Sequence, residues 1–120
     1  MIDHNTALQA GSIIVADGAP SPGLIFTNNI TPHNLYGVFG SGYGSGNACI
    51  AHYFPDSDFR RNIFIGADAF YYPTDNFFYP AIIPAVGFEN YPTDLQLKTT
   101  SPYYNQGTDG TVPGVQGEMP

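Results

Sequence analysis

Short apolar runs bounded by glycine, proline, asparagine or aspartate recur along the chain. The runs lie at residues 12–15, 24–26, 36–39, 62–65 and 94–97. Their apolar side chains are mostly β-branched or aromatic, and such runs between turn residues are typical of strands. No stretch of about a dozen residues keeps the i, i+3, i+4, i+7 spacing of an amphipathic helix without an interrupting glycine or proline. The pattern therefore predicts an all-β protein.

Three segments repeat one pattern, in which an apolar residue is followed three positions later by asparagine. They occupy residues 2–6, 26–30 and 59–63, and the asparagines are Asn5, Asn29 and Asn62. A spacing of 24 residues between the first two is typical of one turn of a solenoid built from short strands. The interval of 33 residues to the third predicts the same turn with an inserted loop, formed by the glycine-rich residues 40–47.

The repeated asparagines have a structural explanation. Asparagine tolerates the left-handed backbone conformation that a sharp corner between strands requires. Stacked turns would place Asn5, Asn29 and Asn62 one above another, so that their amides form a hydrogen-bonded ladder. We therefore predict a structural ladder at these three positions.

Composition excludes several classes of protein. The chain has 120 residues, which predicts a single domain over residues 1–120, and it contains one cysteine, so an internal disulfide is impossible. Three basic residues and a net charge of −7 exclude the basic surface that nucleic acids and anionic membranes require. No apolar run reaches the ~20 residues of a membrane span, and residues 1–5 are not expected to belong to a secretory leader, because they lack its basic start and apolar run.

The last third of the sequence carries a family resemblance. A Leu-x-Leu segment at residues 95–97 is followed by Ser-Pro at 101–102, Gly-x-Asp-Gly at 107–110 and a further glycine, Gly114. This order resembles the closing segment of bacterial right-handed parallel β-helix repeat proteins of the pectate-lyase-like solenoid superfamily. The Asn-Asn-Ile and Arg-Asn-Ile-Phe segments and the aromatic residues from 76 to 78 are also similar to that group.

The resemblance implies an all-β fold, a short right-handed parallel β-helix of two to three coils with an aromatic loop and a C-terminal cap. The coils would span about residues 1–68, the aromatic loop about 69–93, and the last strand and cap about 94–120. It also implies that the chain is a piece of a longer protein that is extracellular or attached to the cell surface.

Three functions are compatible with this sequence. The leading expectation is a non-catalytic fragment of an exported or surface-associated β-helix protein that binds carbohydrate. The first alternative, which follows from the resemblance, is a polysaccharide-active enzyme, either a lyase or a glycoside hydrolase, for which no catalytic residue is identifiable. The second alternative is a self-assembling structural subunit.

Candidate binding residues follow from side-chain chemistry. Exposed tyrosines offer an apolar ring face and a hydroxyl to a sugar, and the same rings would equally seal the side of a short core. The sugar-binding candidates are Tyr71, Tyr72, Tyr79, Tyr103 and Tyr104. Asp56 and Asp58 form the closest pair of acids and are the candidate for a calcium site, although such a pair more often solvates a turn. No cofactor is otherwise expected.

The partners expected are a polysaccharide and a second copy of the chain, with neither nucleic acid nor membrane. The first repeat, residues 2–8, has no cap before it, which would leave the end of a core and a row of unpaired strand groups open. We therefore expect a homo-oligomer that joins head to head through this N-terminal coil.

Overall fold

The fold was analysed in a computed structural model that describes residues 1–78 and 80–115. The described part holds short strands, one α-helix and three 3₁₀ turns. The strands are β1 (Ile2–Asp3), β2 (Ile14–Ala16), β3 (Ile25–Thr27), β4 (Ile30–Pro32), β5 (Val38–Gly40), β6 (Gly44–Ser45), β7 (Asp58–Arg60), β8 (Ile63–Ile65), β9 (Phe88–Asn90) and β10 (Asp94–Leu97). The helix is α1 (Asn47–Tyr53), and the 3₁₀ turns are η1 (Ala69–Tyr71), η2 (Ile83–Val86) and η3 (Thr108–Gly110).

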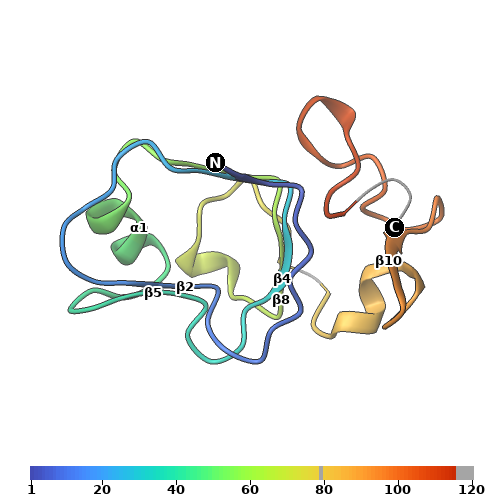
Figure 1. Cartoon of the computed structure of the whole chain (residues 1–120), viewed down its shortest axis with the longest axis horizontal. Coiled ribbons are helices and arrows are strands. Elements are labelled where there is room, and N and C mark those ends of the chain that lie inside the picture. Colours follow the sequence, from blue (N-terminus) through green and yellow to red (C-terminus); the bar gives the residue numbers. More distant parts are fainter. Residues whose placement is uncertain (79, 116–120) are drawn as a thin grey trace.

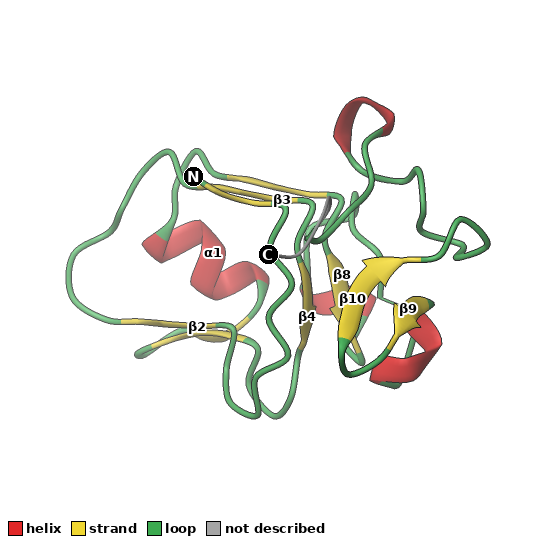
Figure 2. Ribbon diagram, turned by 45° about the vertical axis from the view of Figure 1, so that its right-hand side comes forward, coloured by secondary structure: helices red, strands yellow, loops and turns green. Residues whose placement is uncertain are grey.

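The strands form four small, separate sheets. Two sheets, β1-β3-β7 and β4-β8, are parallel. In the third, β2-β5-β6, strand β5 pairs in parallel with β2 and antiparallel with β6. The fourth is the antiparallel pair β9-β10. The first three surround one part of the molecule, and β9-β10 lies beside them with the C-terminal segment (Figure 1). Helix α1 lies between the sheet of β3 and that of β2 (Figure 2).

The register within the first sheet reproduces the predicted alignment of the repeated segments. Ile2 pairs with Phe26, and Phe26 pairs with Phe59, so residues with the same place in the repeat lie side by side. Phe26 and Phe59 also stack, with ring centroids 5.3 Å apart. The sequence pattern therefore identified which segments are neighbours.

The predicted fold itself, a right-handed parallel β-helix, is wrong. The sheets remain small and separate, two of them contain antiparallel pairs, and the parallel pairs do not combine into a solenoid. After Pro80 the chain leaves the parallel arrangement and folds into the β9-β10 hairpin and loops over a second core. The structure is also not all-β, because α1 fills space between the sheets.

Helix α1 was not predicted because it has only seven residues. Its buried side chains, Cys49, Ile50 and Tyr53, do follow helical spacing, but a single such set is too short for a periodicity argument. Gly46 begins the helix at φ 81°, and a Cβ at this position would overlap the carbonyl of Tyr71. The glycine-rich stretch predicted as a loop therefore contains the point at which a helix begins.

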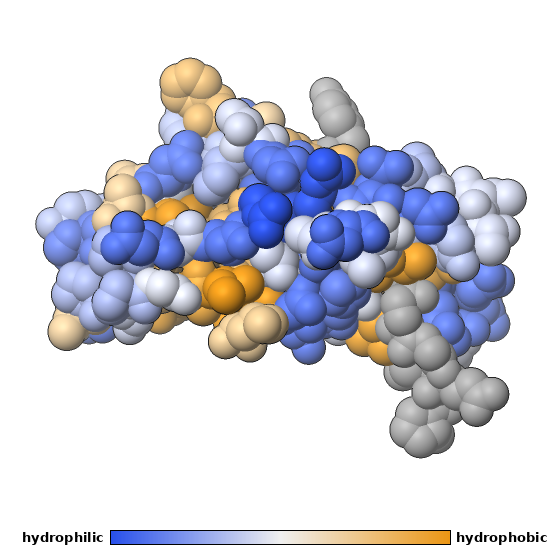
Figure 3. Space-filling model, turned by 90° about the horizontal axis from the view of Figure 1, so that it is seen from above, coloured by the Kyte–Doolittle hydropathy of each residue, from blue (hydrophilic) through white to orange (hydrophobic). Residues whose placement is uncertain are grey.

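Two apolar clusters form the core. The first gathers side chains from the three sheets and α1, including the fully buried Phe64 and Val38. The second packs β4 and β8 against the β9-β10 hairpin through Ile30, Ile63 and Leu97. Seen from above, the surface is mainly hydrophilic, with hydrophobic atoms in separate patches (Figure 3). Among the described residues, no helix is long and apolar enough to cross a membrane.

The left-handed corners do not lie at the repeated asparagines. Positive φ values occur one residue earlier, at His4 (55°), Asn28 (59°) and Arg61 (58°). The prediction that Asn5, Asn29 and Asn62 adopt this conformation themselves is therefore wrong. The preceding residue makes the turn, and the repeated asparagine is left with its side chain directed along the stack of segments.

Candidate interaction surface

The repeated asparagines lie in one hydrogen-bonded row. The backbone and side-chain N–H groups of Asn5 both donate to Oδ1 of Asn29, at 2.9 and 3.2 Å. Asn29 donates in the same way to Asn62, at 3.0 and 3.1 Å. Asn62 continues the row by donating to Asn76, at 2.9 and 3.0 Å. The structure thus brings the three predicted asparagines together and adds a fourth.

Asn76 was not identified as a member of this row. Its position is 14 residues after Asn62, outside the period of the other three. A signal was nevertheless present, since Asn76 begins an Asn-Phe-Phe segment that matches the Asn-Ile-Phe segment starting at Asn62. The pairing of Phe77 with Ile63 in parallel register shows that these two segments are equivalent.

The row has a direction, because every asparagine donates toward the next one along the chain. At the far end, Nδ2 of Asn76 donates to the carbonyls of Phe59 and Pro73, so the row ends with its donors satisfied. At the near end, Oδ1 of Asn5 accepts no hydrogen bond from the described residues, and the Asn5 side chain is exposed. The row therefore presents a free acceptor at one end only.

The sheets are closed at the Asn76 end. The N–H of Arg61 donates to Asp75, and the N–H of Phe64 donates to Phe77, while Phe77 donates back to Asn62. Rings from the same segment complete this closure, with Phe78 stacked on Phe64 at 6.3 Å. The edge of β8 and the corner that follows β7 are therefore already covered at this end.

The sheets are open at the Asn5 end. β1 is the outer strand of β1-β3-β7, and β2 is the outer strand of β2-β5-β6. Between them lies the β4-β8 sheet, where Thr6 pairs with Ile30 of β4. Within the described residues, no strand lies on the other side of Thr6. An outer strand leaves alternate N–H and C=O groups without strand partners. The edges of three sheets therefore meet at one end of the molecule.

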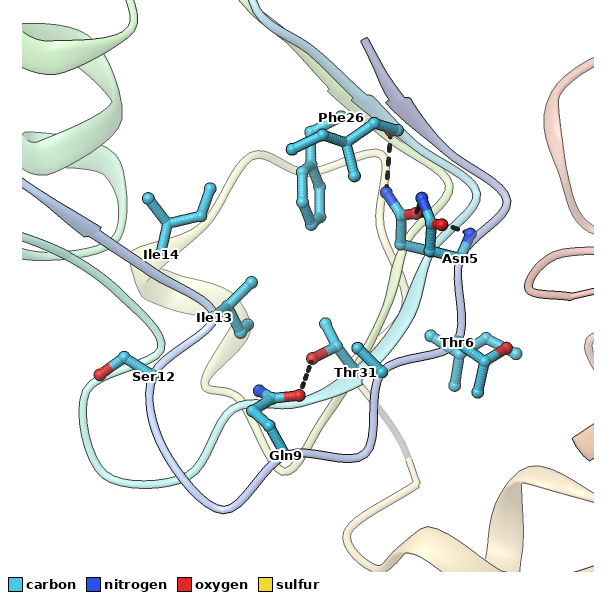
Figure 4. A pocket seen from close by; sticks show the side chains of 12 residues that line it. Asn5, Thr6, Gln9, Ser12, Ile13, Ile14, Phe26 and Thr31 are labelled. Carbon is cyan, nitrogen blue, oxygen red and sulfur yellow. Dashed lines mark hydrogen bonds between the residues drawn. The ribbon is translucent and has the colours of Figure 1, made fainter. Parts of the chain in front are cut away.

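A cavity of about 540 Å³ opens between these edges (Figure 4). Its apolar lining comes from both the outermost segment and the one beneath it, and none of the lining side chains is charged. The lining residues are Ile2, Asn5, Thr6, Ala7, Gln9, Ser12, Ile13, Ile14, Phe26, Asn29, Ile30 and Thr31. The cavity is the exposed end of the first core cluster, to which Phe26 belongs and against which Ile13 and Ile14 pack.

Gln9 holds the rim of this cavity in place. Its Oε1 accepts from the hydroxyl of Thr31 at 3.0 Å, the bond drawn in Figure 4, and its Nε2 donates to the carbonyl of Pro32 at 3.0 Å. The carbonyl of Gln9 accepts from Nδ2 of Asn34 at 2.8 Å. Sequence reasoning missed Gln9, because a lone glutamine in a loop carries no pattern.

A polar cluster fastens the C-terminal segment beside the open end. Oδ1 of Asp3 accepts from Asn28 at 2.8 Å, and its other oxygen lies 2.8 Å from Nδ1 of His4. Asn28 also bonds Thr108 in both directions, and His4 Nε2 lies 3.1 Å from the hydroxyl of Thr111. Burial acts to raise the pKa of Asp3, but the hydrogen bonds from Asn28, His4 and Thr27 together outweigh it and lower the pKa.

The sugar-binding candidates do not form one platform. Tyr71 and Tyr72 line a separate pocket of about 310 Å³, where Tyr72 is buried and Tyr71 is exposed. Tyr103 and Tyr104 are half-buried against the second core cluster, where they seal apolar side chains. Tyr79 lies outside the described residues. The four described candidates therefore lie in two separate places, two in each.

The two acids predicted to hold calcium have different surroundings. Both oxygens of Asp58 accept from Arg60, at 2.6 and 2.9 Å. Asp56 is exposed in a turn at φ 57°. In the described ranges, no group of three or more histidine, cysteine, aspartate or glutamate side chains is placed to hold a metal ion.

Comparison of the chain with protein-family models, with curated proteins and with solved structures finds no match. The resemblance to pectate-lyase-like repeat proteins, and the extracellular or cell-surface location that it implies, therefore stay predictions. Any functional conclusion has to come from the geometry of the surface described above.

Proposed function

We propose that this protein is a self-associating structural subunit whose copies join at the Asn5 end. The proposal rests on one observation, namely that the edges of three sheets meet there around an uncharged, largely apolar cavity. Edge strands are templates for pairing with another chain, and two identical edges pair in antiparallel fashion across a two-fold axis. A second copy would satisfy the strand groups and cover the open core together.

The expected assembly is a closed dimer. A filament would need the Asn5 end of one copy to join the Asn76 end of the next, and the Asn76 end is covered by residues 72–78. A two-fold axis through Asn5 itself would bring two acceptors, the Oδ1 atoms of both copies, against each other. The axis therefore lies beside β1, where each Asn5 Oδ1 meets a backbone N–H of the other copy.

Charge supports the choice of this face. Each chain carries −7, so two copies repel one another over most of their surface. The cavity lining contains no charged side chain, and the carboxylate of Asp3 in β1 is already bonded to Asn28, Thr27 and His4, so this contact brings few unpaired charges into proximity. Because salt screens the remaining repulsion, we expect association to strengthen with ionic strength.

Light scattering over a range of concentrations tests the proposal, with Ile2→Lys as the disrupting variant. Ile2 lines the cavity and is 39% exposed, whereas Ile82 is 63% exposed and lies elsewhere. The wild type and the control Ile82→Lys should dimerise, and Ile2→Lys should stay monomeric while keeping its circular dichroism spectrum. A wild type that is monomeric at every concentration refutes the proposal, and so does a dimer that Ile2→Lys leaves intact.

Thiol cross-linking tests the orientation. Ala7 lines the cavity, Ala51 is on α1, both are exposed, and the native Cys49 is buried. Ala7→Cys should therefore give covalent dimers with a short thiol-reactive cross-linker, and Ala51→Cys should not. Covalent species larger than dimers, or equal yields from the two variants, would contradict a head-to-head arrangement.

A further inference from the structure

A second pocket lies apart from the open end and shares no lining residue with it. It is formed where the connection from β4 to β5 meets β6 and the 3₁₀ turn η1. Its volume is about 310 Å³, and its lining residues are His33, Leu35, Ser45, Asp68, Tyr71 and Tyr72. These residues come from three stretches of the chain, so the pocket is a product of the fold and not of one loop.

The back of the pocket is a pair of side chains held in place by hydrogen bonds. The Tyr72 hydroxyl lies 2.6 Å from Nε2 of His33 and accepts from the N–H of Val38 at 3.1 Å. Nδ1 of His33 lies 2.8 Å from the carbonyl of Asn34, which can only accept, so Nδ1 carries a proton and donates to it. Tyr72 is 2% exposed, and burial raises its pKa, which keeps the phenol protonated.

The mouth of the pocket carries polar groups that are still available. The hydroxyls of Ser45 and Tyr71 make no hydrogen bond to the described residues. Asp68 uses Oδ1 to accept from the N–H of Phe70 at 2.9 Å and keeps Oδ2 for another donor. Two hydroxyls and one carboxylate oxygen of the lining residues are thus available, and Tyr71 and Leu35 beside them are 55% and 78% exposed.

This combination selects a class of ligand. An anion is disfavoured, because Asp68 lines the pocket, no arginine or lysine does, and the chain carries −7. A purely apolar ligand would leave the carboxylate and hydroxyls unpaired, which is costly. A neutral molecule with hydroxyl groups around its rim and an apolar face would satisfy both the polar groups and the tyrosine ring.

We propose that this pocket binds a neutral sugar residue, with its apolar face on Tyr71 and its hydroxyls bonded to Asp68 and Ser45. Tyr71 supplies a flat, exposed surface, and Asp68 accepts from the sugar with the oxygen that does not hold η1. The His33–Tyr72 pair forms the rigid back wall. Of the four described tyrosines considered from the sequence, Tyr71 is the one that offers an exposed ring to this pocket.

The test is titration by amide NMR with the methyl glycosides of glucose, galactose and mannose as probes. Binding at this site should shift the N–H signals of Ser45 and of Val38, whose N–H contacts Tyr72. Tyr71→Ala should weaken binding roughly two- to tenfold, the loss expected for one ring contact. Asp68→Asn, which keeps an acceptor for the Phe70 N–H, should also weaken binding.

Tyr43→Ala is the matched control, because Tyr43 is 47% exposed and lines a different part of the surface, stacked on His52. Its affinity for the probes should equal that of the wild type. The proposal is overturned if no probe shifts these signals, if the shifts lie elsewhere, or if Tyr71→Ala binds as well as the wild type. Tighter binding of glucuronate than of methyl glucoside would also overturn it, since it would contradict the role of Asp68.

Discussion

The row of asparagines should contribute to stability very unequally along its length. Asn62 is fully buried, and its side chain accepts from Asn29 and donates to Phe26 and Asn76. Asn62→Ala removes all of these bonds, leaving the N–H of Asn29 and the carbonyl of Phe26 without this partner in a place that water does not reach. Asn5→Ala removes two bonds of 3.2 Å on an exposed side chain, where water replaces them.

The magnitudes follow from the number of buried groups that lose a partner. Each such group costs about 1–3 kcal/mol, so losing the partner of two of them in Asn62→Ala should lower the free energy of unfolding by roughly 2–6 kcal/mol. Asn5→Ala should lower it by less than about 1 kcal/mol, because its groups are solvated in the variant. Asn29→Ala is expected to fall between the two.

Urea denaturation followed by circular dichroism measures these differences as shifts of the midpoint at constant slope. The melts should be run at concentrations low enough for the chain to be monomeric, so that Asn5 is compared outside any dimer. The reasoning is refuted if Asn5→Ala costs as much as Asn62→Ala. It is equally refuted if Asn62→Ala changes the free energy of unfolding by less than about 1 kcal/mol.

Three further perturbations test other contacts. Asn28→Gly keeps a residue suited to the positive φ but loses the bonds to Asp3 and Thr108, so proteolysis should cut near Thr108 faster than in the wild type; an unchanged cleavage pattern would argue against this attachment. The pKa of Asp3 is lower in the folded state, so its stabilising effect is present at neutral pH and is lost as the pH falls through that lowered pKa. Asp3→Asn should therefore be less stable than the wild type at pH 7 and approach it in acid, and a constant difference across the pH range would contradict the sign. Gly37→Ala places a Cβ against the His33 ring and the Tyr72 hydroxyl at φ +60°, which should cost about 1–3 kcal/mol in urea melts; a neutral effect would show that the pair is not held as described.

Periodicity revealed part of the fold because it reports which segments share an environment. The pattern of an apolar residue three positions before asparagine placed Ile2 beside Phe26 and Phe26 beside Phe59, and these are observed pairs. The pattern did not reveal how far the pairing extends. In strands of two or three residues, the length and direction of each strand are determined by the corners at its two ends. Those corners lie at His4 and Asn28, which carry no repeated residue type.

The candidate surface and pocket were less accessible to sequence reasoning. The polar cluster joins Asn28 to Thr108 across 80 residues, and the back wall of the pocket joins His33 to Tyr72 across 39. Neither pair belongs to a sequence motif, because each forms only when the fold brings together two loops that are far apart in the sequence. The abundance of tyrosines in a sequence does not show which of them are exposed, so it cannot distinguish the exposed Tyr71 from the buried Tyr72.

The unequal spacing of the asparagine row has a consequence for the order in which the protein folds. Joining Asn76 to Asn62 closes a loop of 14 residues, whereas joining Asn62 to Asn29 closes one of 33. Closing the shorter loop costs less conformational entropy, which makes its closure more favourable by about 0.8 kcal/mol of free energy. Formation should therefore begin between β8 and the segment at Asn76. In native-state hydrogen exchange the N–H of Asn5 should open first and that of Asn62 last, so that the molecule frays from the end at which its copies are proposed to meet.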